Sequence, residues 1–216
     1  MKLITETIEN VDYLTEATED GKKFLYVKGP MLVYDKPNRN NRFYSKRIME
    51  PEVKRYIKEY VETKRALGEL GHPDTPSINL ERVSHMIVSL EDTGECFVGK
   101  ARILDTPYGQ IVRNMIESGV RLGVSSRGMG TLTANRQGIN EVQGDFRLAT
   151  AADIVADPSA PGAFVNGIME NKEWLFVEGR FVEIDIDNAK QQIRQASSKQ
   201  IEEVAIQLFS NFISKL

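Results

Sequence analysis

Short apolar segments separated by turn residues fill most of this sequence, and they constrain its fold more than any other feature. Segments that alternate apolar and polar residues, or that are rich in Val, Ile, Phe and Tyr, are typical of β-strands. The Asp92-Thr93-Gly94 turn predicts a hairpin between two of them, and Gly29-Pro30 predicts a bend in another. We expect strands at 23–34, 82–90, 95–104, within 121–155 and at 174–186.

Helical patterns are fewer, and three are clear. Residues 45–67 keep an apolar face at helical spacing. Thr106 followed by Pro107 predicts a helix start, and Gly119 predicts its end. Ser197 and Gln200 form a capping box before an apolar stripe at the end of the chain. The sequence therefore predicts an α+β protein, with a β-barrel or a curled antiparallel sheet flanked by helices.

The length of 216 residues suits one domain with small terminal additions. We expect a loosely held acidic leader over residues 1–21, the main domain over 22–186 and an amphipathic helical region over 187–216. The apolar stripe of that last helix has two interpretations. It packs on the domain, or it contacts a partner molecule.

Composition excludes several classes of protein. The formal net charge of −3 does not indicate nucleic acid as the main partner. Cys96 is the sole cysteine, as expected in a reducing compartment. No apolar run approaches the roughly 20 residues of a membrane-spanning helix, and the acidic N-terminal stretch does not resemble a secretory signal. We expect a cytoplasmic protein without membrane or nucleic-acid partners.

Only two histidines can serve as a base near neutral pH. His85 lies within a strand pattern, where a structural role is expected. His72 follows Gly71 and precedes Pro73, in a loop of the kind that carries catalytic side chains. A histidine that only ends a helix is the alternative for His72.

Two further segments carry candidate reactive groups. Ser125 and Ser126 lie between glycines in the run from Gly123 to Gly130, where a serine next to a histidine could act as a nucleophile. A plain Gly/Ser turn is the alternative. Asp153 lies in an apolar stretch, where a carboxylate usually has a partner, either a catalytic imidazole or an arginine such as Arg147 or Arg180. A carboxylate that only caps a turn is the remaining alternative.

Four segments, in order along the chain, together resemble the prohead core protein proteases of tailed bacteriophages. The stretch 38–44 (Asn-Arg-Asn-Asn-Arg-Phe-Tyr) resembles an Asn/Arg-rich motif of that family. Residues 66–73 resemble its histidine segment, 123–130 its serine segment, and 153–161 its downstream loop. The resemblance covers most of the chain from about residue 25 to 170.

The resemblance implies a fold similar to herpesvirus capsid-maturation proteases and a Ser-His-Asp endopeptidase. It implies that His72 is the general base, Ser125 the nucleophile and Asp153 the third member of the triad. Ser126 stays open as the rival nucleophile, and Glu69 as the rival carboxylate. Backbone N–H groups near Arg127, or in the loop 158–162, are the candidates for the oxyanion hole.

Family members resemble one another in cutting after glutamate, with an apolar residue two positions earlier and a small residue following. Arginine suits a buried glutamate, and our substrate-binding candidates are Arg39, Arg42 and Arg127, with Arg147 as a further one. Leu14-Thr15-Glu16-Ala17 fits the cleavage pattern, so we expect self-processing between Glu16 and Ala17. Ile168-Met169-Glu170-Asn171 fits less well.

The implied substrates are viral scaffold or core proteins and capsid proteins, cut inside the prohead in the host cytoplasm. No cofactor is expected, and a homodimer follows by resemblance alone. An inactive capsid or scaffold protein with the same fold is the second hypothesis. A metal-dependent hydrolase using His72 and His85 is the third, although no HExxH motif is present.

Overall fold

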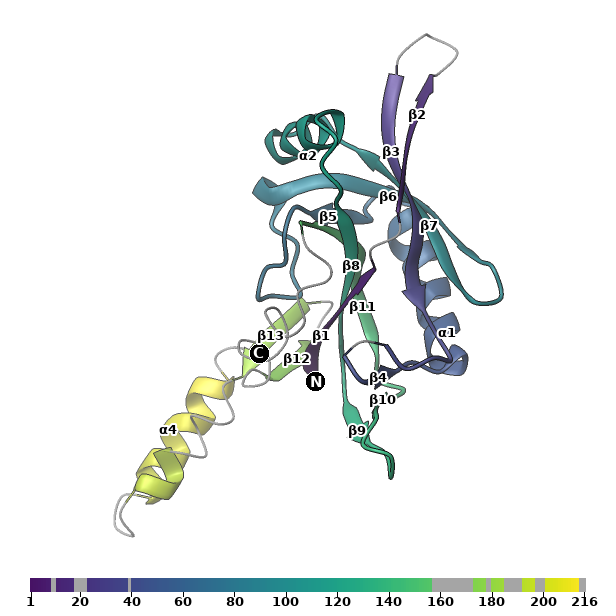
Figure 1. Cartoon of the computed structure of the whole chain (residues 1–216). Helices are drawn as coiled ribbons and strands as arrows, with labels where there is room; N and C mark the ends of the chain where they lie inside the picture. Colours follow the sequence, from purple (N-terminus) through teal and green to yellow (C-terminus); the bar gives the residue numbers. More distant parts are fainter. Residues whose placement is uncertain are drawn as a thin grey trace.

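The computed structural model describes residues 1–8, 11–17, 23–38, 40–156, 173–177, 180–184, 192–196 and 201–213. It is an α+β protein with mostly sheets and few helices, which confirms the expected class (Figure 1). Strands far apart in the sequence are neighbours in these sheets. Their order determines which loops reach the candidate site.

The larger sheet has five strands in the order β2-β3-β7-β6-β5. Adjacent strands are antiparallel, and the expected hairpin joins β6 to β7. The register of β3 shifts between Pro30 and Leu32, close to the predicted bend. The strands are β2 (Asp12–Ala17), β3 (Lys23–Val33), β5 (Leu67–Glu69), β6 (Val83–Asp92) and β7 (Cys96–Ile103).

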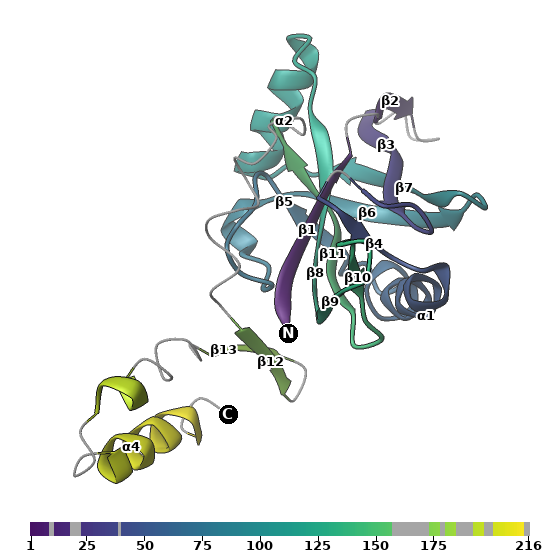
Figure 2. The ribbon, with the colours of Figure 1, turned by 60° about the horizontal axis from the view of Figure 1, so that its bottom comes forward.

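A three-stranded sheet carries the serine segment. Its middle strand is β8 (Gly123–Gly130), which is buried along its whole length and pairs antiparallel with β1 (Lys2–Ile8) on one side. On the other side it pairs antiparallel with β11 (Arg147–Val155), through a register shifted in two places. The strand β1 is therefore an edge strand lying along β8, as both views show (Figures 1 and 2).

The two sheets meet where β5 ends. Leu70 and Ile154 form an isolated parallel bridge, and the Gly71 N–H donates to the Ile154 carbonyl at 2.7 Å. The described strands form a curled arrangement, but not the closed barrel that was one of the two expected forms. Because β5 is short and β11 has bulges, the two sheets pair only at this bridge. A closed barrel requires a continuous ladder of hydrogen bonds between neighbouring strands.

Two helices flank these sheets. Helix α1 (Lys46–Tyr56) continues into a π-helical turn, η1 (Ile57–Val61), and α2 (Pro107–Glu117) begins at the predicted Thr106 cap. The Thr106 hydroxyl accepts from the Gly109 N–H at 3.0 Å. The first helix ends earlier than the predicted Leu67, because Lys64 turns the chain with φ 59°. Leu67 then belongs to β5, where it pairs with Met86 of β6.

Smaller elements complete the chain. Asn79 caps a short 3-10 turn before β6, and the hairpin β12–β13 confirms the strand pattern predicted near Trp174. The expected C-terminal helix is present, whereas its Ser197–Gln200 capping box lies outside the described residues. These elements are η2 (Leu80–Arg82), β4 (Arg42–Phe43), β9 (Leu132–Ala134), β10 (Asn140–Val142), β12 (Glu173–Val177), β13 (Arg180–Ile184) and α4 (Ile201–Ile213).

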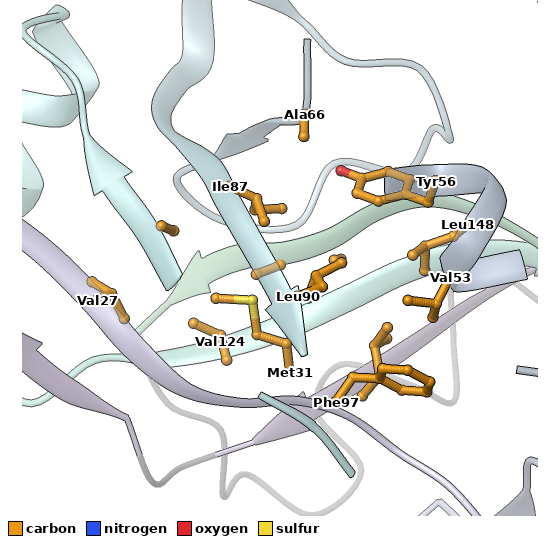
Figure 3. Close-up of a cluster of buried hydrophobic side chains, with 14 of the residues drawn as sticks. Val27, Met31, Val53, Tyr56, Ala66, Ile87, Leu90, Phe97, Val124 and Leu148 are labelled. Atoms are coloured by element: carbon orange, nitrogen blue, oxygen red, sulfur yellow. The ribbon is translucent and has the colours of Figure 1, made fainter. Parts of the chain in front are cut away.

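The core lies between the curled sheets and α1 (Figure 3). Met31 from β3, Ile87 from β6 and Val124 from β8 meet Val53 and Tyr56 from α1, and all five are at most 2% exposed. Burial of each large apolar side chain is worth roughly 1.5–3 kcal/mol, so this cluster stabilises the contact between sheets and helix. On α4, by contrast, Ile206 and Phe209 are exposed.

Most of the described residues of the acidic leader lie in strands. Residues 2–8 form β1 and residues 12–17 form β2, so both belong to sheets of the main domain. The Tyr13 hydroxyl donates to the Leu122 carbonyl at 2.9 Å and accepts from the Leu122 N–H at 2.7 Å, which ties β2 to the start of β8. The sequence boundaries at 21 and 186 stay predictions.

Replacing Gly68 by alanine tests the packing where β5 and β6 meet near β11. An added Cβ would lie 2.2 Å from His85 Nε2 and 2.3 Å from the Ala152 carbonyl oxygen. Since a backbone atom must move, we expect Gly68→Ala to lower the free energy of unfolding by about 3 kcal/mol in urea titrations. Gly144→Ala, whose Cβ would meet nothing within 4 Å, is the control. Equal stability of both variants would contradict this packing.

Candidate active site

Asp153 is the centre of the candidate site. It lies on β11, is fully buried, and accepts from the Glu69 N–H at 2.9 Å through Oδ1. Its Oδ2 accepts from Arg127 Nε at 2.9 Å and lies 3.2 Å from His72 Nδ1. Asp153 therefore contacts both of the partner types that its apolar surroundings predicted, an imidazole and an arginine.

Arg127, on β8, is the arginine that pairs with Asp153, and the expected Arg147 pairs with Glu52 instead. Its Nη2 donates to Glu69 Oε1 at 3.1 Å and to Asp153 Oδ1 at 3.3 Å. Its Nη1 donates to the carbonyls of Thr75 and Ser77. With Nε on Asp153, all five N–H donors of this buried guanidinium have partners. This arrangement favours a positioning role for Arg127, and its expected contact with substrate stays a prediction.

Glu69 completes a buried ionic network across three strands. It lies at the end of β5, and its Oε1 also accepts from the Asn79 N–H at 3.0 Å. Its Oε2 lies 3.5 Å from Nε of Arg82, which is partly exposed. The Glu69 carboxylate thus contacts arginines and a backbone N–H. The carboxylate that contacts the His72 imidazole is that of Asp153. We call Glu69, Arg127 and Asp153 the buried network.

His72 reaches this network from the loop that leaves β5. Gly71 takes φ 84°, a left-handed value that favours glycine, and its N–H is fixed to β11. The next residue is thereby placed beside Asp153, with only 8% of the imidazole exposed. The structure thus brings together two of the three predicted triad residues, from segments more than 80 positions apart in sequence.

Ser125 lies directly across the sheet from Asp153. The two residues are register partners on β8 and β11, so their side chains lie on the same face of the sheet. Arg127, two residues further along β8, also reaches Asp153 from that face. Ser126 is placed on the opposite face, which it shares with the core residue Val124. The geometry favours Ser125 over Ser126 as the reactive hydroxyl.

The electrostatics hold Asp153 in its charged form. Burial by itself raises the pKa of the Asp153 carboxyl, but the contact with His72 and the charge of Arg127 outweigh burial. The net result is a pKa below the ordinary value. An ionised carboxylate beside Nδ1 can orient an imidazole and stabilise its cation.

His85 has the structural role expected of it. It is fully buried, its Nδ1 lies 2.9 Å from the Ser84 hydroxyl, and its Nε2 lies 2.9 Å from the Ala152 carbonyl. Burial lowers the pKa of its imidazole, which favours the neutral form. Both ring nitrogens are therefore used within the core, and His85 does not contribute to a metal site with His72.

The remaining predicted residues lie elsewhere. Arg42 contacts Glu6, with its Nη1 3.1 Å from Glu6 Oε1, and Arg147 contacts Glu52 of α1. Arg39 and the loop 158–162 lie outside the described residues. Sequence reasoning missed Glu6, because the acidic leader offered several similar carboxylates and nothing local to distinguish them.

Two negative findings apply to the part of the chain that the structure describes. In it, no cluster of three or more His, Cys, Asp or Glu side chains is arranged to hold a metal ion. Among the helices described there, none is both long enough and apolar enough to cross a bilayer.

Comparison with known proteins defines the class of this protein. The family model of prohead core protein serine proteases matches residues 4–173, which include all three candidate residues. The chain belongs to this family, which confirms the family resemblance seen in the sequence.

Two relatives are similar over most of their length. The prohead core protein protease of Enterobacteria phage T4 is 38% identical over 168 residues, which cover 74% of this chain and 78% of that protein. The solved structure of the bacteriophage T4 capsid assembly protease has a TM-score of 0.67 and 35% identity. That match covers 71% of this chain and 97% of the solved one.

Substituting Arg127 tests the buried network. Arg127→Met removes the guanidinium that two buried carboxylates share, so we expect it to lower the free energy of unfolding by about 3–5 kcal/mol at pH 7. Lys54→Met is the control, because Lys54 pairs with Glu50 on the surface, and it should change stability by less than about 0.5 kcal/mol. Urea titrations measure both.

The same variant should show a defined pH dependence. In the wild type, the lowered pKa of Asp153 contributes stability above the unfolded value of about 3.9, and this contribution is lost as the pH falls. Without Arg127, burial raises that pKa, and protonation then relieves the buried charge. The stability difference between the two proteins should therefore shrink from pH 7 to pH 4. A constant difference would contradict the assignment.

Proposed function

We propose that this protein is a serine endopeptidase in which Ser125 is the nucleophile, His72 the general base and Asp153 the carboxylate that orients the imidazole. The main support is the position of Asp153, which contacts His72 at 3.2 Å and faces Ser125 across the sheet. Membership in a family of serine proteases adds to it.

The proposed reaction has two steps. His72 Nε2 takes the proton of Ser125 as Oγ bonds to the substrate carbonyl carbon, and Asp153 stabilises the imidazolium. The peptide C–N bond then breaks, the leaving nitrogen receives that proton from His72, and an acyl ester remains on Ser125. Water, deprotonated by His72, cleaves the ester and returns the proton to Ser125. Backbone N–H groups near Arg127 stay the candidate oxyanion donors.

The proposed substrates are scaffold or core proteins and capsid proteins, cut after glutamate inside the prohead. The family description and the names of the two phage T4 relatives support the choice of substrate proteins. Cleavage after glutamate is proposed from the resemblance of the motif segments alone. A homodimer and a distant relation to herpesvirus proteases stay proposals from resemblance. The alternative is an inactive assembly protein with the same fold, and the next experiment distinguishes it from a protease.

Serine substitutions test the proposed nucleophile. We expect Ser125→Ala to lower the rate of cleavage of a Leu-Thr-Glu-Ala peptide by on the order of 10³-fold or more, since it removes the attacking oxygen. Ser126→Ala, whose side chain lies on the core face, should keep activity. Cleavage is followed by chromatography of the two fragments.

Two outcomes would sink the assignment. Loss of cleavage in Ser126→Ala alone would move the nucleophile by one residue and to the opposite face. Absence of cleavage by the wild type, together with no labelling by a serine-reactive phosphonate, would favour the inactive assembly protein.

Self-processing between Glu16 and Ala17 is a further proposal. The bond lies in β2, which is an edge strand and so can leave its sheet more readily than a central strand. Glu16 is partly exposed, with its carboxylate 2.6 Å from Lys100 Nζ. We expect the mature wild type to begin at Ala17 by N-terminal sequencing, whereas Glu16→Gln and Ser125→Ala should keep Met1. A mature chain that begins at another residue would contradict cleavage at this site.

A further inference from the structure

The backbone of β1 lies against the proposed nucleophile. The Ser125 hydroxyl donates to the carbonyl oxygen of Glu6 at 2.8 Å. This carbonyl belongs to the peptide bond between Glu6 and Thr7, and these residues pair with Ser126 and Ser125 in the antiparallel ladder. The strand β1 therefore occupies the position that an extended peptide would take if it added to the edge of β8.

The side chain of Glu6 is held by one short segment. Its Oε1 accepts from Arg42 Nη1 at 3.1 Å and from the Tyr44 hydroxyl at 3.0 Å. Its Oε2 accepts from Asn40 Nδ2 at 2.9 Å. Arg42 Nη1 also donates to the Thr5 carbonyl at 3.0 Å, so the same arginine contacts the backbone just before the glutamate. Both carboxylate oxygens and the preceding peptide are thus recognised.

This segment has its own internal support. The side-chain oxygen of Asn38 accepts from the N–H of Asn40 at 3.0 Å and from the N–H of Arg42 at 2.9 Å. Asn41 takes φ 55°, which asparagine tolerates, and its amide donates to the Gly138 carbonyl at 2.7 Å. None of these contacts involves Glu6. The backbone that carries the donors Asn40 and Arg42 is therefore arranged by the turn itself and not only by the carboxylate that they bind.

The residues before Glu6 match the cleavage pattern that the resemblance implies. Ile4 lies two positions earlier, is 1% exposed and belongs to the main core cluster. Its side chain is on the same face of β1 as that of Glu6. Ile4-Thr5-Glu6 thus has the apolar-x-Glu pattern that is also present in Leu14-Thr15-Glu16.

We propose that β1 occupies the substrate site of this protease as an internal inhibitor, and that Asn40, Arg42 and Tyr44 form its pocket for glutamate. The proposal rests on the proposed function, because it takes Ser125 as the nucleophile. A substrate would pair with β8 in place of β1, its apolar residue where Ile4 lies and its glutamate beside Arg42. Cleavage of the chain after Glu16 would free β1 to dissociate.

The experiment uses the Glu16→Gln chain as its parent, so that residues 1–16 are retained. It compares the Glu6→Gln and Arg42→Met variants of that chain on two peptides, Leu-Thr-Glu-Ala and Leu-Thr-Gln-Ala. Glu6→Gln weakens the hold on β1 but keeps the pocket, so kcat/KM should rise about tenfold for both peptides with their ratio unchanged. Arg42→Met removes the cation that selects glutamate, so the Glu/Gln ratio of kcat/KM should fall at least tenfold. This ratio is independent of how often β1 leaves the site.

Controls separate this proposal from its foundation. Glu50→Gln, which loses a surface contact to Lys54, should change neither the rates nor the ratio. In the Ser125→Ala background, a fluorescent Leu-Thr-Glu-Ala peptide should bind about tenfold more tightly after Glu6→Gln, measured by anisotropy. This binding requires no cleavage, so it still tests β1 if the protease function fails. Asn40→Ala replaces Arg42→Met if that variant does not fold, and should also lower the ratio.

Some results would overturn the proposal and leave the protease intact. The first is that Ser125→Ala abolishes cleavage while the Glu16→Gln parent and its Glu6→Gln variant cleave at equal rates. The second is that Arg42→Met leaves the Glu/Gln ratio unchanged. In that case β1 would be an ordinary structural strand.

Discussion

The buried network of Glu69, Arg127 and Asp153 is the interaction on which the rest of this structure depends. It joins β5, β8 and β11, and none of the three side chains is exposed. Buried charges are costly unless paired and hydrogen-bonded, and here a single guanidinium meets both carboxylates. The network therefore allows an ionised Asp153 to lie inside the protein beside His72.

The catalytic candidates lie on separate elements that meet at this network. His72 is held by a loop fixed to β11, whereas Ser125 is held by the strand that carries Arg127. Each group is positioned by backbone pairing that does not depend on the other. Rigid positioning of this kind is what a catalytic site requires, since small displacements lower the rate strongly.

The strand β1 gives the N-terminal segment two roles at once. Leu3 and Ile4 are buried, so β1 contributes apolar contacts to the fold. Its Glu6 carbonyl also contacts Ser125, so the strand lies in the proposed path of the substrate. An inhibitor that is part of the same chain reaches a high effective concentration, and separating it from the chain removes that advantage.

Local signals in the sequence predicted local elements well. The Thr106–Pro107 helix start and the hairpin at residues 92–94 were correct, because caps and tight turns depend on neighbouring residues. The first helix was predicted too long, since its end depends on the pairing of Leu67 with β6. The acidic leader gave no local sign that it pairs with β8, because that pairing joins residues more than 100 positions apart.

The sequence by itself determined the α+β class, the family and the residue types of the site, because these depend on local patterns and motif segments. Only the tertiary structure decided which groups meet. It paired Asp153 with both His72 and Arg127, placed Ser125 and Ser126 on opposite faces, and brought Glu6 to Arg42. Such choices depend on strand order and register, which arise when distant segments pack into one core and leave no trace in a local window of sequence.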